Sequence, residues 1–257
     1  MISAIDKLLA IRNRLASGSV VLNGWSMLGE TTVLETIARA GYDTVCTDYQ
    51  HGLAPMARAA DHVRAIEVGG AVPFARAPGV DTISIGKLLD AGYAGIICPM
   101  VNSVQDAEAF VAASRFPPAG IRSYGPVRAG VRDGAAYFDS FAPNIVRLAM
   151  IETRDGCDSL PGILAVDGID GIYIGPSDLA ISLGLPPRPD PVDEVMLTTM
   201  GAIARQAMAA RKIAGIHTNH ADYACKRIED RFNFLTCGID TRVLATGLQS
   251  IVSTIHR

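Results

Sequence analysis

The sequence predicts one α/β domain folded as a closed (β/α)8 barrel, the TIM barrel, over residues 1–257. Three observations support this fold class. The length is usual for a single barrel of this type. Short apolar segments alternate with amphipathic ones from end to end, and eight such pairs can be counted. Strict alternation implies a parallel sheet, because each strand needs a crossover helix before the next strand.

The expected strands are brief, rich in Val, Ile and aromatic residues, and bounded by Gly or Pro. They lie at 20–26, 42–50, 71–77, 94–101, 145–153, 171–178, 214–219 and 232–240. The clearest expected helices lie at 32–41, 81–92, 104–117, 195–212 and 243–257. The first two end in Ala-Gly, and glycine is the residue that most often stops a helix. An open doubly wound sheet is the alternative, but no G-x-G-x-x-G motif follows the first strand.

Composition narrows the classes of protein to consider. With 49% hydrophobic and 19% charged residues, the chain is typical of a globular protein. A net charge of −3 and no Lys/Arg-rich run provide no electrostatic basis for binding nucleic acid. No stretch is long and apolar enough for a membrane span, and Asp6 and Lys7 interrupt any signal-peptide core. The five cysteines form no C-x-x-C pair, so we expect a cytoplasmic protein without a zinc site or disulfides.

The active site of such a barrel lies at the carboxyl ends of its strands and in the loops that follow them. The residues at those predicted ends are Trp25, Asp48, Tyr49, Gln50, His51, Arg76, Pro99, Glu152, Gly175, Pro176, Ser177, Asp178, His217 and Cys237. Two acids, an Arg and a His therefore concentrate at one rim, whereas most other charges fall on predicted helices.

Glu152 and Asp178 are the candidate metal ligands. Glu152 shares a strand face with Leu148 and Met150, which places its carboxylate at the top of an apolar interior. A charge there is costly unless it is paired or binds a metal. Adjacent strand ends lie about 5 Å apart, so both carboxylates could bind one hard cation such as Mg²⁺ or Mn²⁺. The alternatives are that Glu152 pairs with Arg76 or Arg154, and that Asp178 caps a helix.

Arg76 and His51 are the candidate catalytic groups. Arg76 follows an apolar strand, where its guanidinium could stabilise a substrate oxygen that becomes negative. An ordinary ion pair at the strand end is its alternative role. His51 could act as a general base, with Asp48 three residues earlier to orient its ring.

Several long segments together resemble the HpcH/HpaI aldolases. The segments are TDYQHG, VPFARAPGVDTISIGKLLDAG, ICPMVNSVQDAEAFVAASRFPPAGIRSYGP, IETR and VDGIDGIYIGPSDLAISLG. The resemblance covers nearly the whole chain. It implies a barrel of the phosphoenolpyruvate/pyruvate-binding type that needs one divalent metal ion (Mg²⁺, Mn²⁺ or Co²⁺). It further implies cleavage of 4-hydroxy-2-oxo acids to pyruvate, or a close analogue, and an aldehyde.

The resemblance also implies roles for individual residues. Glu152 and Asp178 would bind the metal, and Arg76 would contact the keto oxygen. His51 would be the base-side residue, supported by Asp48 and by Asp90 of LLDAG. The segment Gly175, Pro176, Ser177 would hold the donor carboxylate through its backbone. The family further implies a homo-oligomer, a hexamer built as a trimer of dimers, with the C-terminal helix exchanged between subunits.

The chain departs from the common family pattern at three positions. Gln50 replaces Glu in D-x-E-H, Met150 replaces Gln before I-E-T, and His217 replaces an aliphatic residue. Because the metal pair, Arg76 and His51 are retained, we interpret the D-x-Q-H-G form as a branch related to hydroxy ketoacid aldolases. The departures leave the aldehyde and the choice between pyruvate and hydroxypyruvate open.

Two further hypotheses are retained. One is a citryl- or malyl-CoA lyase-like enzyme, which would need a basic site for the CoA thioester, with Arg128 and Arg132 as the available cations. The other is a non-catalytic barrel that binds an oxo acid. A Schiff-base mechanism is disfavoured because Lys7, Lys87, Lys212 and Lys226 all lie away from predicted strand ends.

Overall fold

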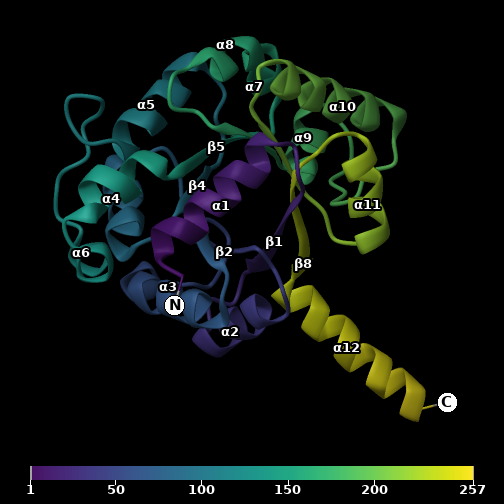
Figure 1. Cartoon of the computed structure of the whole chain (residues 1–257). Helices are drawn as coiled ribbons and strands as arrows, with labels where there is room; N and C mark the ends of the chain where they lie inside the picture. The colour runs from purple at the N-terminus through teal and green to yellow at the C-terminus, as the bar shows by residue number, and fades with distance from the viewer. Residues whose placement is uncertain (1, 257) are drawn as a thin grey trace.

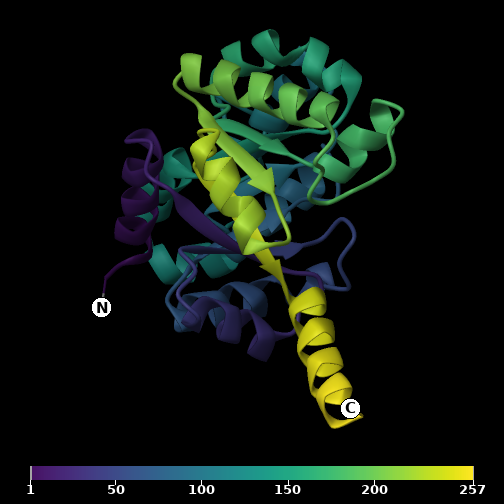
Figure 2. The same cartoon turned by 90° about the vertical axis from the view of Figure 1, so that its right-hand side faces the viewer.

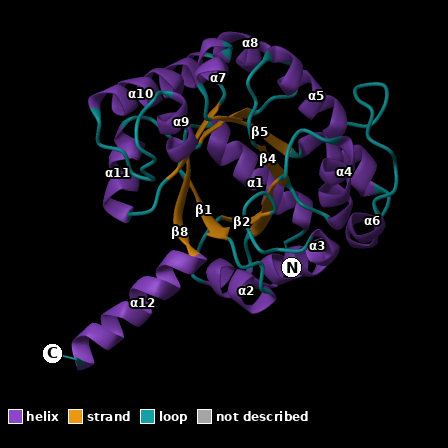
Figure 3. Ribbon diagram, turned by 180° about the vertical axis from the view of Figure 1, so that it is seen from behind, coloured by secondary structure: helices purple, strands orange, loops and turns teal. Residues whose placement is uncertain are grey.

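The computed structural model describes residues 2–256 and is a closed barrel of eight parallel strands in sequential order (Figures 1 and 3). The strands are β1 (Val21–Ser26), β2 (Thr44–Asp48), β3 (Val72–Arg76), β4 (Gly95–Cys98), β5 (Val146–Ile151), β6 (Gly171–Ile174), β7 (Ile213–His217) and β8 (Phe234–Ile239). β1 pairs with β8, which closes the sheet. The predicted fold class is thereby confirmed, and the open-sheet alternative is wrong.

Helices surround the barrel (Figure 3). Those along the first half are α1 (Ala4–Ala16), α2 (Thr31–Arg39), η1 (Met56–Arg58), α3 (Ala59–Gly69), α4 (Thr82–Ala91), α5 (Val104–Ser114) and α6 (Val127–Asp133). The second half contains η2 (Tyr137–Phe141), η3 (Ala142–Asn144), α7 (Arg154–Asp158), α8 (Leu160–Ala165), α9 (Pro176–Ser182), α10 (Glu194–Ala209), α11 (Ala221–Glu229) and α12 (Asp240–Ile255).

Local sequence explains the limits of α4. Asp81 caps its start, with the carboxylate accepting hydrogen bonds from the backbone N–H groups of Ile83 and Ser84. Gly92 ends it at φ 104°, a left-handed conformation that glycine adopts without strain. The D-A-G pattern therefore stops the helix where the sequence predicts.

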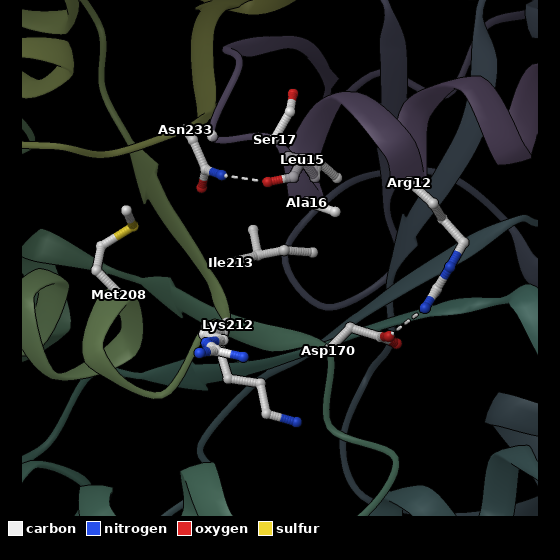
Figure 4. Close-up of a pocket in the computed structure, with 11 residues that line it drawn as sticks. Arg12, Leu15, Ala16, Ser17, Asp170, Met208, Lys212, Ile213 and Asn233 are labelled. Atoms are coloured by element: carbon white, nitrogen blue, oxygen red, sulfur yellow. Dashed lines mark hydrogen bonds and ion pairs between the residues drawn. The ribbon is translucent and has the colours of Figure 1, made fainter.

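The two mouths of the barrel differ. At the amino ends of the strands α1 lies across the opening (Figure 1), beside a cavity of about 410 Å³ (Figure 4). Polar groups of its lining bond to the chain itself: Arg12 pairs with Asp170 at 2.8 Å, and Asn233 donates to the carbonyl of Leu15 at 3.1 Å. This mouth is thus closed by structural contacts, and the free polar groups discussed below lie at the other one.

Helix α12 stands away from the barrel (Figures 1 and 2). Large apolar side chains are exposed along it: Val243, Leu244, Leu248, Ile251, Val252 and Ile255. A helix with this much apolar surface in water needs a covering surface. Within residues 2–256, no helix is both long and apolar enough to cross a bilayer.

Candidate functional site

A cavity of about 420 Å³ opens at the carboxyl ends of the strands. Its lining includes eight of the predicted site residues: Trp25, His51, Arg76, Gly175, Pro176, Ser177, Asp178 and His217. Asp48 and Glu152 are buried at the same end, next to lining residues. Side chains from β1, β3 and β7, from the loop after β2 and from the first turn of α9 therefore converge as the barrel geometry predicts.

Glu152 follows β5 and is only 2% exposed. Its Oε1 accepts a hydrogen bond of 2.8 Å from the backbone N–H of Met100. The pKa of Glu152 is raised to about 7, mainly by burial and in part by the negative charge of Asp178, against the opposing influence of Met100 and Arg76. Glu152 is thus a buried carboxylate beside a like charge, which is the arrangement that a bound cation would relieve.

The structure does not show the alternative roles considered for these two acids. No ion pair among residues 2–256 includes Glu152. Asp178 lies in the first turn of α9, whose N-cap position is Gly175 and has no side-chain cap bond. A cluster of three or more His, Cys, Asp or Glu side chains suited to a metal is absent from the described part of the chain. Glu152 and Asp178 could therefore supply two ligands and leave the other positions to water or substrate.

Met100 orients Glu152 in a way that the sequence does not predict. Its backbone has φ 54°, in the left-handed region that non-glycine residues rarely adopt. That conformation directs the N–H toward the carboxylate. Such backbone strain often occurs at functional sites, where the surroundings impose it.

Gly175 packs directly against Glu152. A Cβ at position 175 would lie 2.5 Å from Glu152 Oε2 and 2.5 Å from Met150 Cε. Since φ is −97°, the backbone itself would accept alanine. We therefore expect Gly175→Ala to displace the carboxylate and to weaken divalent-metal affinity by about 10–100-fold, the range for changes beside metal ligands. Calorimetric titration with Mn²⁺ measures this.

Gly86→Ala is the matched control, because a Cβ there meets no atom within 4 Å. That variant should bind metal as the wild type does. An unchanged affinity in Gly175→Ala would contradict a ligand role for Glu152.

Asp48 and Arg76 form a buried bidentate ion pair. Arg76 Nε donates to Asp48 Oδ1 at 2.8 Å and Nη2 donates to Oδ2 at 2.5 Å. The two residues are directly opposite each other in the β2–β3 register. Burial alone would raise the pKa of Asp48, but the hydrogen bonds and charge of Arg76 lower it. The pair is thus ionised, and two of the five Arg76 N–H groups are committed to Asp48.

The predicted link between Asp48 and the His51 ring differs from what the structure shows. Asp48 Oδ1 accepts from the backbone N–H of Gln50 at 3.0 Å and of His51 at 3.3 Å. Asp48 therefore holds the loop after β2, while the exposed His51 side chain lines the cavity edge. The difference arises because strand register places Arg76 beside the carboxylate.

Asp90 does not reach this cavity. It lies in the last turn of α4 and accepts a hydrogen bond of 2.7 Å from Arg122, which is almost fully buried. In a βα unit the helix runs back toward the amino ends of the strands, so its last turn lies far from the catalytic rim. Within one chain Asp90 therefore does not contact His51, and a supporting role for it stays a prediction.

Aromatic rings form one wall of the cavity. Trp25 stacks on Tyr173 with centroids 6.0 Å apart and meets the edge of His217 at 4.8 Å. The Arg76 guanidinium carbon lies 5.0 Å from the Trp25 ring centroid, a cation–π distance. Trp25 therefore holds Arg76 and His217 in place from one side.

Sequence reasoning missed other lining residues: Met27, Met150, Pro187, Pro189, Asn219, Ile239 and Arg242. Both polar side-chain atoms of Asn219 are buried without a hydrogen-bond partner in the described part of the chain. Its place at the end of a predicted strand was an available signal. Arg242 gave no such signal, because it lies on the helix after β8.

Comparison with known proteins finds relatives that cover most of this chain. The model of the HpcH/HpaI aldolase/citrate lyase family matches residues 23–246. A hydroxypyruvate/pyruvate aldolase of Rhizorhabdus wittichii is 37% identical over 243 residues, covering 95% of this chain and 97% of that protein. A 4-hydroxy-2-oxo-heptane-1,7-dioate aldolase of Salmonella paratyphi C is 32% identical, with 95% and 93% covered.

The three-dimensional comparison gives the same result. A solved HpcH/HpaI aldolase/citrate lyase family protein from Burkholderia cenocepacia has a TM-score of 0.89 at 25% identity, covering 96% of this chain and 99% of that one. Aldolases at 32–37% identity over most of the chain confirm that this protein is an enzyme of the aldehyde-lyase type, and the non-catalytic hypothesis is set aside. The chain belongs to the HpcH/HpaI aldolase/citrate lyase family.

Proposed function

We propose that this protein is a divalent-metal-dependent aldolase that reversibly cleaves 4-hydroxy-2-oxo acids to pyruvate or hydroxypyruvate and an aldehyde. The observation that carries the proposal is Glu152, a buried carboxylate with no cationic partner among residues 2–256, beside Asp178 and on the same cavity as Arg76. The relatives named hydroxypyruvate/pyruvate aldolase support this class of donor.

The two carboxylates suit a hard cation such as Mg²⁺, Mn²⁺ or Co²⁺, because such ions prefer oxygen ligands and keep open positions. When bound, the cation would polarise the 2-oxo group and stabilise negative charge on it. Arg76 would donate to the same oxygen with the N–H groups that Asp48 leaves free. The buried ion pair with Asp48 fixes the orientation of the guanidinium before substrate arrives.

The remaining groups bind the donor and move a proton. The backbone N–H groups of Gly175 and Ser177 would hold the donor carboxylate at the start of α9. Pro176 between them has no N–H and restricts the turn. His51, at the open edge of the cavity, would accept the proton of the 4-hydroxyl group as the C3–C4 bond breaks. No lysine lines the cavity among the described residues, which supports a mechanism without a Schiff base.

Exchange of the C3 protons of pyruvate with deuterium tests enolate formation without any aldehyde. We expect exchange with the metal-loaded enzyme, loss of exchange after EDTA treatment, and recovery on adding Mg²⁺, Mn²⁺ or Co²⁺. NMR follows the reaction directly. Exchange that is indifferent to both treatments would contradict the metal requirement.

A CoA thioester substrate is less well supported. Arg128 and Arg132 both bond to the carboxylate of Glu67, and Arg132 also pairs with Asp133 at 2.7 Å. These cations are therefore neutralised within the chain, and neither lines the cavity. A nucleotide phosphate would have to displace those ion pairs.

We also propose a homo-oligomer, a hexamer arranged as a trimer of dimers, in which α12 packs on a neighbouring subunit. The exposed apolar side chains of α12 support this, because a second copy of the chain would remove them from water. Arg242, near the start of that helix, lines the cavity. The position of α12 would thereby couple assembly to the site.

A further inference from the structure

We propose that His217 selects donors with a 3-hydroxyl group, so that hydroxypyruvate is preferred to pyruvate. In this proposal Nε2 of His217 accepts a hydrogen bond from the 3-hydroxyl. A series of buried hydrogen bonds that passes through Tyr173 holds the ring in the tautomer that this requires, with the proton on Nδ1. The proposal rests on the function proposed above, since it concerns the donor at the same site.

The series of buried hydrogen bonds begins away from the cavity, and the donor and acceptor of each bond are defined. Thr44 Oγ1 donates to Asn23 Oδ1 at 2.7 Å, so the amide of Asn23 presents its Nδ2 to Thr236. Asn23 Nδ2 donates to Thr236 Oγ1 at 2.8 Å. Tyr173 donates its phenol proton to the same Thr236 oxygen at 2.6 Å. All four side chains are fully buried inside the barrel, where water does not compete for these bonds.

The order of donors and acceptors determines which ring nitrogen of His217 carries the proton. Because the Tyr173 proton is directed to Thr236, its phenol oxygen is left to accept from His217 Nδ1, 3.0 Å away. Nδ1 therefore carries the ring proton and Nε2 carries the lone pair. The pKa of His217 is lowered to about 3, mainly by burial and in part by the charge of Arg76, so the ring is neutral.

The position of the ring suits a group on C3 of the donor. His217 lines the cavity with Arg76, and its ring stands edge-on to Trp25 at an interplanar angle of 89°. In the proposed function Arg76 contacts the oxygen on C2, and C3 is the adjacent carbon. Nε2 makes no hydrogen bond to any described residue. It is therefore available to a hydroxyl on that carbon.

Pyruvate has a methyl group at C3, which cannot donate to Nε2. A site that is built to bond a substrate hydroxyl discriminates against the analogue without it, because its own polar atom is left unpaired.

Tyr173→Phe removes the phenol oxygen and leaves the ring. We expect the ratio of kcat/KM for hydroxypyruvate to that for pyruvate to fall about tenfold, the effect of one hydrogen bond. C3–deuterium exchange with each donor, corrected for the rate without enzyme, provides both values. Tyr49→Phe is the matched control, because Tyr49 also bonds to a histidine Nδ1, that of His62 at 2.7 Å, but away from the cavity. It should leave the ratio unchanged.

The tautomer is measured independently by nitrogen NMR of the metal-free protein labelled with ¹⁵N-histidine. The wild type should show His217 protonated at Nδ1. Thr236→Val removes the oxygen that accepts from Tyr173, so the phenol should turn to His217 Nδ1 and move the ring proton to Nε2. If Tyr173→Phe does not fold, the donor ratio is measured in Thr236→Val instead.

Three results would overturn the proposal: a wild-type ring protonated at Nε2, an unchanged donor ratio in a folded variant with an altered tautomer, or equal losses for both donors. Failure of the proposed function would look different. In that case neither donor would exchange its C3 protons with the wild-type enzyme, while the tautomer measurement would still give an answer.

Discussion

Glu152→Gln is expected to abolish metal-dependent turnover and, in the metal-free protein, to raise thermal stability. The loss of activity follows because the amide removes one of the two proposed anionic ligands. Metal catalysis of this kind is worth several kcal/mol, so kcat/KM should fall by at least about 10³-fold.

The gain in stability has a separate cause. Burial and the adjacent Asp178 raise the pKa of Glu152 from its ordinary value of 4.5 to about 7, although Met100 and Arg76 oppose the shift. The folded state therefore holds this proton more tightly than the unfolded state does. As pH rises from 4.5 through 7, the metal-free wild type loses stability that the glutamine variant keeps. At pH 8 the difference is at most about 3 kcal/mol, which corresponds to several degrees in Tm.

Thermal unfolding of both proteins from pH 5 to pH 8, after chelation and after adding Mn²⁺, measures these effects. The wild type should be stabilised by metal and the variant should not. Glu108→Gln, the same change at an exposed helical position, is the control and should behave as the wild type. A metal-induced rise in Tm that survives in Glu152→Gln would remove Glu152 from the metal site.

The second large effect is expected at the Asp48–Arg76 pair. Arg76→Lys keeps the positive charge but cannot make two parallel bonds to Asp48 while also reaching the substrate. We expect kcat/KM to fall by about 10²–10³-fold, the range for losing a group that stabilises a developing oxyanion. Arg76→Ala should in addition cost about 3–5 kcal/mol of stability, because it leaves Asp48 buried and unpaired.

The stability effect can be separated from the catalytic one. Asp48→Asn added to Arg76→Ala should restore part of the stability, since the buried charge is gone, without restoring activity. Arg64→Lys is the control for the chemical change, because Arg64 pairs with Asp61 at 2.7 Å on an exposed helix surface. It should change stability by less than about 0.5 kcal/mol. Full activity in Arg76→Lys would assign Arg76 a structural role only.

Local sequence was sufficient to predict the barrel and the strand ends at which the site lies. The period of apolar residues and the helix-ending glycines predict eight strand–helix units, and the units imply a barrel with one catalytic rim. Trp25, Arg76 and His217 lie at strand ends because each directly follows or ends an apolar segment. These features depend on neighbours within the chain, so the sequence alone determined them.

Other features depended on contacts between residues far apart in the chain. Strand register placed Arg76, and not the His51 ring, against Asp48. The Met100 N–H reaches Glu152 across 52 positions, and Thr236 bonds to Asn23 across 213. Asp90 lies away from the rim because α4 runs back toward the amino ends of the strands. The Thr236–Asn23 contact follows from closure of the barrel, which brings β1 beside β8. The contacts of Asp48 and Glu152 follow from the pairing of neighbouring strands, β2 with β3 and β4 with β5.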